Sequence, residues 1–144
     1  MPERPPFSPV IALLTVSSVW DTQLGAALRG LGLTTRKYGL LAHIQATPGI
    51  SFSELARRSQ ITVQTAHTAV RTLVDDGLVE DATSHAGSAS DLRVTQHGET
   101  ALAEAERVLA DLDHAIGEKA PELTSALAEL FRDSTAATIP ASSR

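Results

Sequence analysis

Apolar residues recur at helical spacing twice between residues 51 and 79, which predicts two short helices joined by a tight turn. The first helix begins with a predicted capping box. In it the Ser51 hydroxyl accepts the amide of Glu54, and the Glu54 carboxylate accepts the amide of Ser51. The apolar side of this helix is made by Leu55, Ala56 and Ile61. A helix-turn-helix is therefore predicted to begin at Ser51.

The second helix of this pair has an apolar stripe and a polar face. We expect Thr62 to cap its N-terminus and Gly77 to end it. The stripe consists of Ala66, Ala69, Val70 and Leu73. The opposite face carries Gln64, Thr65, His67, Thr68 and Arg71. Side chains of these types can hydrogen-bond to base edges and phosphates, so the second helix is predicted to read DNA.

The flanking pattern predicts a mainly α fold with a small β-hairpin wing. A helix capped by Ser8 should run to about Gly30, and a second should run from Thr34 or Thr35 to about Ala46, with Tyr38, Leu41 and Ile44 inward. Two extended runs, 78–82 and 91–94, flank a loop rich in Gly, Ser and Ala and predict a hairpin. Thr95 should start a long helix, which Gly117 weakens, and Pro121 should start another.

We read the 144 residues as a single winged-helix domain with helical flanks. The winged helix covers about 34–94, dimerisation helices cover 8–33 and 95–136, and loose tails cover 1–7 and 137–144. The long helix that starts at Thr95 carries an apolar stripe with coiled-coil spacing, made of Leu102, Ala105, Leu109, Leu112 and Ile116. Such exposed stripes favour a twofold dimer. The alternative is that these helices fold back over their own subunit.

Composition and charge narrow the function. The chain has no cysteine, which excludes disulfides, thiolate zinc sites and thiol-based redox sensing. Its net charge of −5 is concentrated after residue 93, where four positive charges face nine negative ones, whereas residues 34–93 carry six of each. The acidity is confined to the C-terminal helices and to the end of the second motif helix, at Asp75, Asp76, Glu80 and Asp81. This distribution is compatible with a protein that meets DNA on one face.

Other classes of function find little support in the sequence. It contains no Gly-rich phosphate loop and no nucleophile elbow, so we expect no enzyme. The five histidines show no metal-ligand spacing, and neither a metal nor a cofactor is predicted. No run reaches the ~20 apolar residues that span a bilayer, so we expect a cytoplasmic protein without a membrane partner. The competing hypothesis is a winged-helix protein-interaction module without specific DNA binding.

The order and spacing of these motifs resemble the multiple-antibiotic-resistance regulator (MarR) family of bacterial transcription regulators across nearly the whole chain. The matching residues are Leu55-Ala56, Thr65, Leu73, Gly77-Leu78-Val79 and Val94-Thr95-Gln96-His97-Gly98. The resemblance implies a homodimer whose recognition helices enter successive major grooves of double-stranded DNA at an inverted-repeat operator. It also implies a repressor that responds to a small-molecule effector.

The chain departs from the family pattern on the expected DNA surface. Ala86, Gly87 and Ser88 stand where family wings usually carry an Asp-Arg-Arg-like run, and Thr68 replaces an arginine common in recognition helices. The predicted DNA-binding residues are Ser51, Ser53, Thr62, Gln64, Thr65, His67, Thr68, Arg71, Ser88 and Arg93. Trp20 and Tyr38, which could converge from the first two helices, are the predicted ligand-binding residues.

Overall fold

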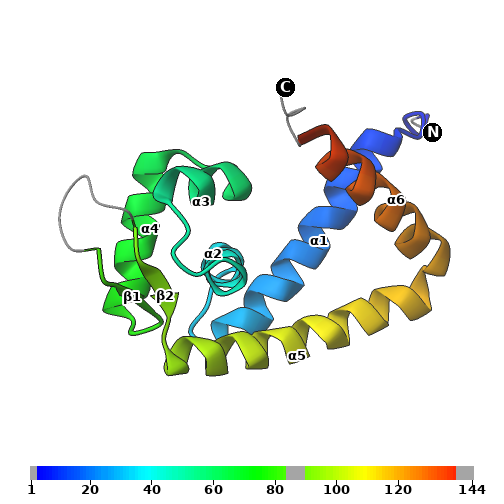
Figure 1. Cartoon of the computed structure of the whole chain (residues 1–144). Coiled ribbons are helices and arrows are strands. Elements are labelled where there is room, and N and C mark those ends of the chain that lie inside the picture. The colour runs from blue at the N-terminus through cyan, green and yellow to red at the C-terminus, as the bar shows by residue number, and fades with distance from the viewer. Residues whose placement is uncertain (1–2, 84–89, 139–144) are drawn as a thin grey trace. The chain divides into compact units, whose positions relative to one another are not determined.

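Helices make up most of the structure, a computed structural model that describes residues 3–83 and 90–138, and an antiparallel hairpin interrupts them (Figure 1). In chain order the elements are α1 (Pro9–Arg29), α2 (Thr35–Ala46), α3 (Phe52–Ser59), α4 (Val63–Asp75), β1 (Val79–Asp81), β2 (Leu92–Val94), α5 (Gln96–Lys119) and α6 (Pro121–Thr138). The chain divides into two compact units, Met1–Val108 and Leu109–Arg144. The boundary falls within α5, inside the segment predicted to dimerise.

The predicted helix starts are confirmed because each has a cap that the local sequence specifies. The Ser8 hydroxyl accepts the amide of Ile11, and Pro9 occupies the first turn of α1. At the start of α2, the Thr34 hydroxyl accepts the amide of Lys37 at 3.1 Å. Gly117 does not interrupt α5, which continues to Lys119.

The core of the first unit lies around α2, which Figure 1 shows end-on among its neighbours. Leu41 and Ile44 are fully buried as predicted, while Tyr38 is only partly buried against the same cluster. The other fully or nearly fully buried members include Leu28, Leu33, Leu40, Ile50, Leu55, Val70, Leu73, Leu78, Val79 and Leu92. These side chains come from α1, α2, α3, α4, the hairpin and the segments that connect them, so one apolar cluster holds the helix-turn-helix against the neighbouring elements.

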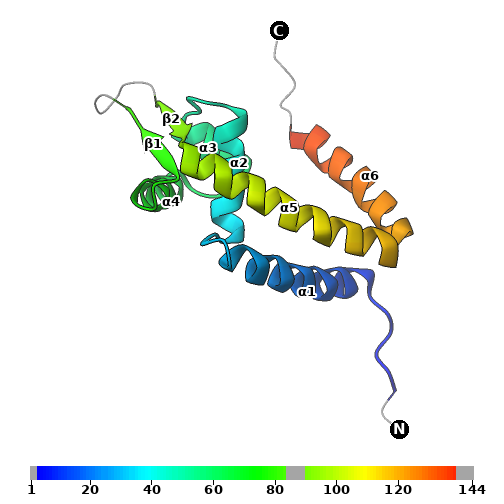
Figure 2. The ribbon, with the colours of Figure 1, turned by 90° about the horizontal axis from the view of Figure 1, so that it is seen from below.

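The hairpin joins α4 to α5 and confirms the predicted wing strands. Strand β1 lies beside β2 (Figure 2). The two strands pair antiparallel, with Val79 opposite Val94. At its base the Thr95 amide donates to the carbonyl of Leu78 at 3.0 Å, and the Thr95 hydroxyl donates to the carbonyl of Gly77 at 2.6 Å. The same hydroxyl accepts the amide of Gly98, so Thr95 both caps α5 and ties it to the hairpin.

Helix α1 exposes a large apolar surface. Leu28 is its one fully buried residue among those described, whereas Val10, Ile11, Leu13, Leu14, Val16 and Val19 are exposed. With a mean hydropathy of 1.3 over its most apolar stretch, α1 is long and apolar enough to cross a membrane by length and composition. The expectation that no segment reaches that length is therefore wrong. The helix also carries Asp21 and ends at Arg29.

The second unit comprises the end of α5 and α6. Leu127, Leu130 and Phe131 of α6 are exposed. The predicted coiled-coil stripe of α5 is divided between the two units. Leu102 and Ala105 are buried within the first unit, where they belong to its core. Leu109, Leu112 and Ile116 are only partly buried. The alternative in which the helices cover their own subunit thus holds for the first turns of α5.

Candidate nucleic-acid interface

The turn between α3 and α4 sets the direction of the second motif helix. Gln60 ends α3 with a left-handed backbone, at φ 56°. The next amide, of Ile61, donates to the carbonyl of Ala56 at 3.0 Å, which closes the helix end. Ala56 and Ala66 are buried at this junction and allow α3 and α4 to pack closely. The predicted helix-turn-helix is confirmed.

The first turn of α4 is organised by two threonines. The Thr62 hydroxyl accepts the amide of Thr65 at 3.1 Å and donates to the Thr65 hydroxyl oxygen at 2.8 Å. Thr62 is therefore confirmed as the cap, and its hydroxyl proton is already engaged. The Thr65 hydroxyl proton is left available for an outside acceptor, because a hydroxyl has one donor and two acceptor positions.

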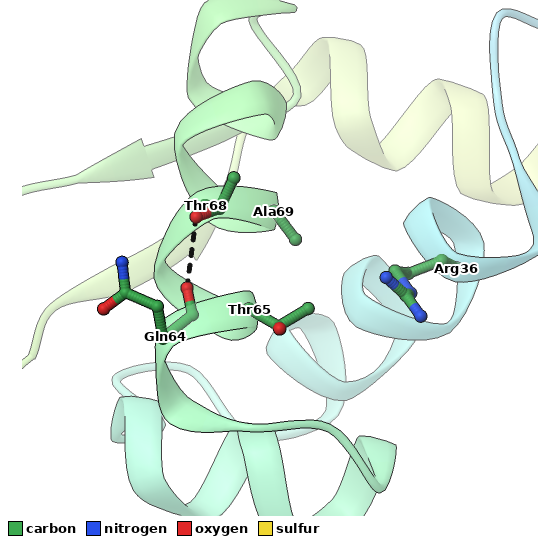
Figure 3. Close-up of a pocket in the computed structure, with 5 residues that line it drawn as sticks. All are labelled: Arg36, Gln64, Thr65, Thr68 and Ala69. Carbon is green, nitrogen blue, oxygen red and sulfur yellow. Dashed lines mark hydrogen bonds between the residues drawn. The ribbon is translucent and has the colours of Figure 1, made fainter.

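The remaining polar residues of α4 differ in the hydrogen-bond donors and acceptors that they leave free for a ligand. The Thr68 hydroxyl donates to the carbonyl of Gln64 at 3.1 Å, so Thr68 presents acceptor positions rather than a free donor (Figure 3). The amide group of Gln64 extends outward from the helix. Arg71 is exposed and has no ion-pair partner within the described residues. Gln64, Thr65 and Arg71 are thus the best equipped to donate to DNA.

A hollow lies beside this polar face. It encloses about 260 Å³ and is lined by Arg36, Gln64, Thr65, Thr68 and Ala69. Arg36 comes from the first turn of α2, on the opposite side of the hollow from Thr65 and Ala69 (Figure 3). Sequence reasoning missed Arg36. One feature of the sequence could have indicated it. The first turn of α2 has basic residues and no acidic one, although the helix dipole favours negative charge at an N-terminus.

His67 is positioned by an aromatic contact that the helical pattern does not predict. Its ring stacks on Phe52 of α3, with the ring centroids 3.8 Å apart and the planes 18° from parallel. The residue remains exposed, so its edge can still meet a ligand. One face of the His67 ring packs against Phe52, and this contact helps to hold α3 against α4.

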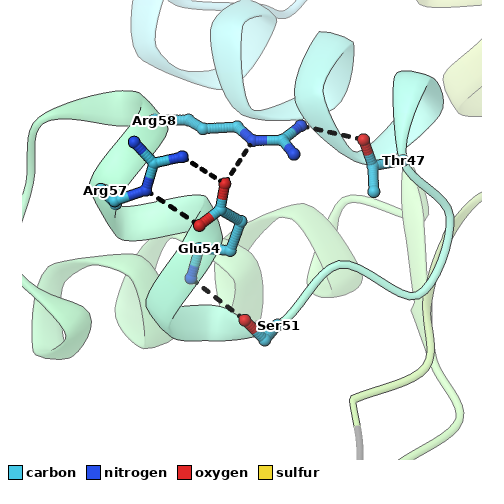
Figure 4. A network of polar contacts seen from close by, with 5 residues as sticks. All are labelled: Thr47, Ser51, Glu54, Arg57 and Arg58. Atoms are coloured by element: carbon cyan, nitrogen blue, oxygen red, sulfur yellow. Dashed lines mark hydrogen bonds and ion pairs between the residues drawn. The ribbon is translucent and has the colours of Figure 1, made fainter. Parts of the chain in front are cut away.

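The predicted capping box forms only in part. The Ser51 hydroxyl accepts the amide of Glu54 at 3.1 Å, as predicted (Figure 4). The Glu54 carboxylate instead accepts hydrogen bonds from Arg57 and Arg58, with each Nε at 2.9 Å. The reciprocal half of the box is therefore wrong, because two nearby guanidinium groups attract the carboxylate more strongly than a backbone amide does.

This network shapes the charge of α3. Hydrogen bonds from Arg57 and Arg58 lower the pKa of Glu54 to about 2, and the carboxylate raises the pKa of Arg57. Arg58 also donates from Nη1 to the hydroxyl of Thr47 at 2.9 Å, which ties α3 to the end of α2 (Figure 4). Both arginines of α3 thus share one carboxylate, and the helix carries less free positive charge than its sequence suggests.

The wing offers one positively charged side chain among the residues described. Arg93 donates from Nε to Asp91 at 2.9 Å, with both groups largely exposed, so part of its charge is offset. Ser53 is exposed on α3. Ser88, the other predicted wing residue, lies outside the described residues, as does His85.

The described histidines form no metal-binding cluster with acidic residues. Within residues 3–83 and 90–138, no group of three His, Asp or Glu side chains is placed to hold a metal ion. His114 faces Glu118 at 3.2 Å on the exposed side of α5. His43 is partly buried in α2, and burial together with the nearby positive charge of Arg58 lowers its pKa.

A second hollow, of about 280 Å³, lies between the start of α2 and the end of α4. Leu31, Gly32, Lys37, Asp76, Leu78 and His97 line it. Lys37 and Asp76 form an ion pair across it at 2.7 Å, which connects α2 to the end of α4. Trp20 and Tyr38, the predicted ligand-binding pair, line neither this hollow nor the one beside α4.

The fold is shared with known regulators. Residues 31–87 match the sequence profile of the MarR family. The HTH-type transcriptional repressor Rv2887 of Mycobacterium tuberculosis is 33% identical over 102 residues, which cover 70% of this chain and 73% of the repressor.

Two crystal structures of that M. tuberculosis protein are similar to this one, each at 28% identity. The complex with DNA has a TM-score of 0.72 and covers 87% of this chain and 98% of the other. The complex with salicylic acid has a TM-score of 0.67 and covers 89% and 97%. With the winged helix and these matches together, the chain belongs to the MarR family of transcription regulators.

Proposed function

We propose that the protein is a dimeric, sequence-specific DNA-binding repressor that reads an inverted-repeat operator with α4. The observation that carries the proposal is the outward polar face of α4, on which Gln64, Thr65 and Arg71 keep donors available. Gln64 can pair with adenine in the major groove, and Arg71, nearly two turns later, is suited to a phosphate. The similar repressor structure solved with DNA supports this role.

We propose a homodimer formed through the outer helices. The apolar residues that α1 and α6 expose would be costly to leave in water, and a second copy is the simplest cover. Two recognition helices about 34–36 Å apart would then enter successive major grooves. This arrangement explains why a single winged helix carries such long flanking helices.

A small-molecule effector completes the proposal. A similar family member has been crystallised with salicylic acid, an aromatic carboxylic acid. Trp20 and Tyr38 remain our proposed ligand-contacting residues, because an aromatic side chain with one polar atom suits such a molecule. We also place the protein in the cytoplasm and assign it no catalytic activity, as expected for a transcription regulator of this family.

Selection of bound fragments from a genomic DNA pool tests the function. The purified protein should enrich fragments that share an inverted repeat with half-site centres about 10–10.5 base pairs apart. Its affinity for the enriched duplex should exceed its affinity for a scrambled one by at least about 10³. Recovery of fragments without a shared sequence would reject specific reading and favour the protein-interaction module.

A further inference from the structure

We propose that Arg36, together with the Thr65 hydroxyl, binds a phosphate of the DNA backbone in the hollow beside α4. Arg36 is on α2, outside the helix-turn-helix, and is not among the DNA-binding residues predicted from the sequence. The inference rests on the proposed function, because it identifies a further contact of the same DNA-reading surface.

The first step of the argument is the position of Arg36. It lines a hollow of about 260 Å³ with four residues of α4, among them Gln64 and Thr68 (Figure 3). Any strand of DNA that brings a base edge to Gln64 also brings its backbone close to this face, since α4 lies within the groove. A cation at the edge of that face is placed to meet a phosphate.

The second step concerns charge. Arg36 and Lys37 both lie in the first turn of α2, where a positive charge is unfavourable because it meets the positive end of the helix dipole. Lys37 is neutralised by Asp76 at 2.7 Å. Arg36 is exposed and has no ion-pair partner within the described residues. An unpaired cation in an unfavourable position is explained if an external anion binds it.

The third step is the second donor. The Thr65 hydroxyl receives a hydrogen bond from Thr62 at 2.8 Å, which leaves its own proton free. Thr65 lines the same hollow from the α4 side. A phosphate seated there would accept from a guanidinium on α2 and a hydroxyl on α4. Contacts of this kind fix the position and register of a recognition helix without reading sequence.

Titrations at several salt concentrations test the proposal, with the selected duplex and a scrambled one. Arg36→Ala should weaken both complexes by about tenfold and reduce the log–log salt slope by about one unit. Arg36→Lys should keep the salt slope of the unmutated protein, because the slope depends on the positive charge and not on the planar shape of the guanidinium group. Arg107→Ala, three turns into α5, removes the same charge and should keep the slope of the unmutated protein.

The outcomes separate the two proposals. If the unmutated protein binds duplex DNA with a salt slope that Arg36→Ala leaves unchanged, the phosphate contact is wrong while the proposed function stands. If Arg36→Ala instead relaxes sequence preference at one base pair with the slope unchanged, and Lys does not rescue it, Arg36 reads a base and the proposal is overturned. If the unmutated protein does not bind DNA, both proposals fail.

Discussion

Replacing Gly98 with alanine should separate α5 from the hairpin. A Cβ at this position would lie 2.6 Å from Cγ1 of Val94 and closer still to the carbonyl oxygen of Leu78. Leu78 cannot move freely, because the same carbonyl accepts the amide of Thr95 at 3.0 Å. The Thr95 hydroxyl further holds the carbonyl of Gly77. The substitution must therefore displace backbone, not a flexible side-chain end.

The magnitude follows from these contacts. Overpacking a rigid site costs about 1–3 kcal/mol, and loss of the amide–carbonyl bond between Thr95 and Leu78 costs about 1 kcal/mol more. The intrinsic helix preference of alanine over glycine offsets about 0.5–1 kcal/mol. We expect a net destabilisation of about 2–3 kcal/mol. With a urea m-value of about 1–3 kcal/mol/M, the unfolding midpoint should fall by roughly 1–2 M.

The assay is urea unfolding followed by circular dichroism at one fixed protein concentration, because dimer stability depends on concentration. Gly39→Ala is the matched control. Gly39 lies inside α2, and a Cβ there would meet nothing within 4 Å, so this variant should be stabilised by about 0.5–1 kcal/mol. If Gly98→Ala unfolds at the same urea concentration as the unmutated protein, the reasoning is refuted.

Three further predictions concern charge and assembly. Glu54→Gln frees Arg57 and Arg58 and should raise DNA affinity and the salt slope in a binding titration; unchanged affinity would mean that α3 stays away from phosphates. Because the pKa of Glu54 is lowered, its stabilising contribution should be complete above about pH 4.5 and lost as pH falls towards 2, which comparative unfolding of Glu54→Gln would detect. Charged replacements of Leu109 and Leu112 should give monomers or unfolded chains, and a one-chain light-scattering mass for the unmutated protein would contradict the dimer.

Local rules were enough to predict most elements from sequence. The starts of α1, α2 and α4 follow from Ser8, Thr34 and Thr62, whose hydroxyls each accept an amide three residues later. Such caps depend on neighbouring residues alone, so a single sequence reveals them. The hairpin was predictable for a similar reason, because short extended runs flank a loop of small residues.

Contacts between elements were not predictable in the same way. Arg36 and Thr65 are far apart in sequence, and nothing in either local pattern indicates that they share a hollow. The stacking of His67 on Phe52 also depends on how α3 and α4 pack. Within α3, the carboxylate of Glu54 could reach several hydrogen-bond donors. It accepts from the guanidinium groups of Arg57 and Arg58 and not from the backbone amide of Ser51.

The central claim is that α4 reads DNA, and titration of Gln64→Ala and Arg71→Ala tests it most directly. Both variants are measured against the selected and the scrambled duplex at several salt concentrations. Gln64→Ala should cost about 1–3 kcal/mol on the selected duplex and relax preference at one position per half-site. Arg71→Ala should weaken both duplexes alike and reduce the salt slope. If both variants bind both duplexes as the unmutated protein does, α4 is not the reading helix.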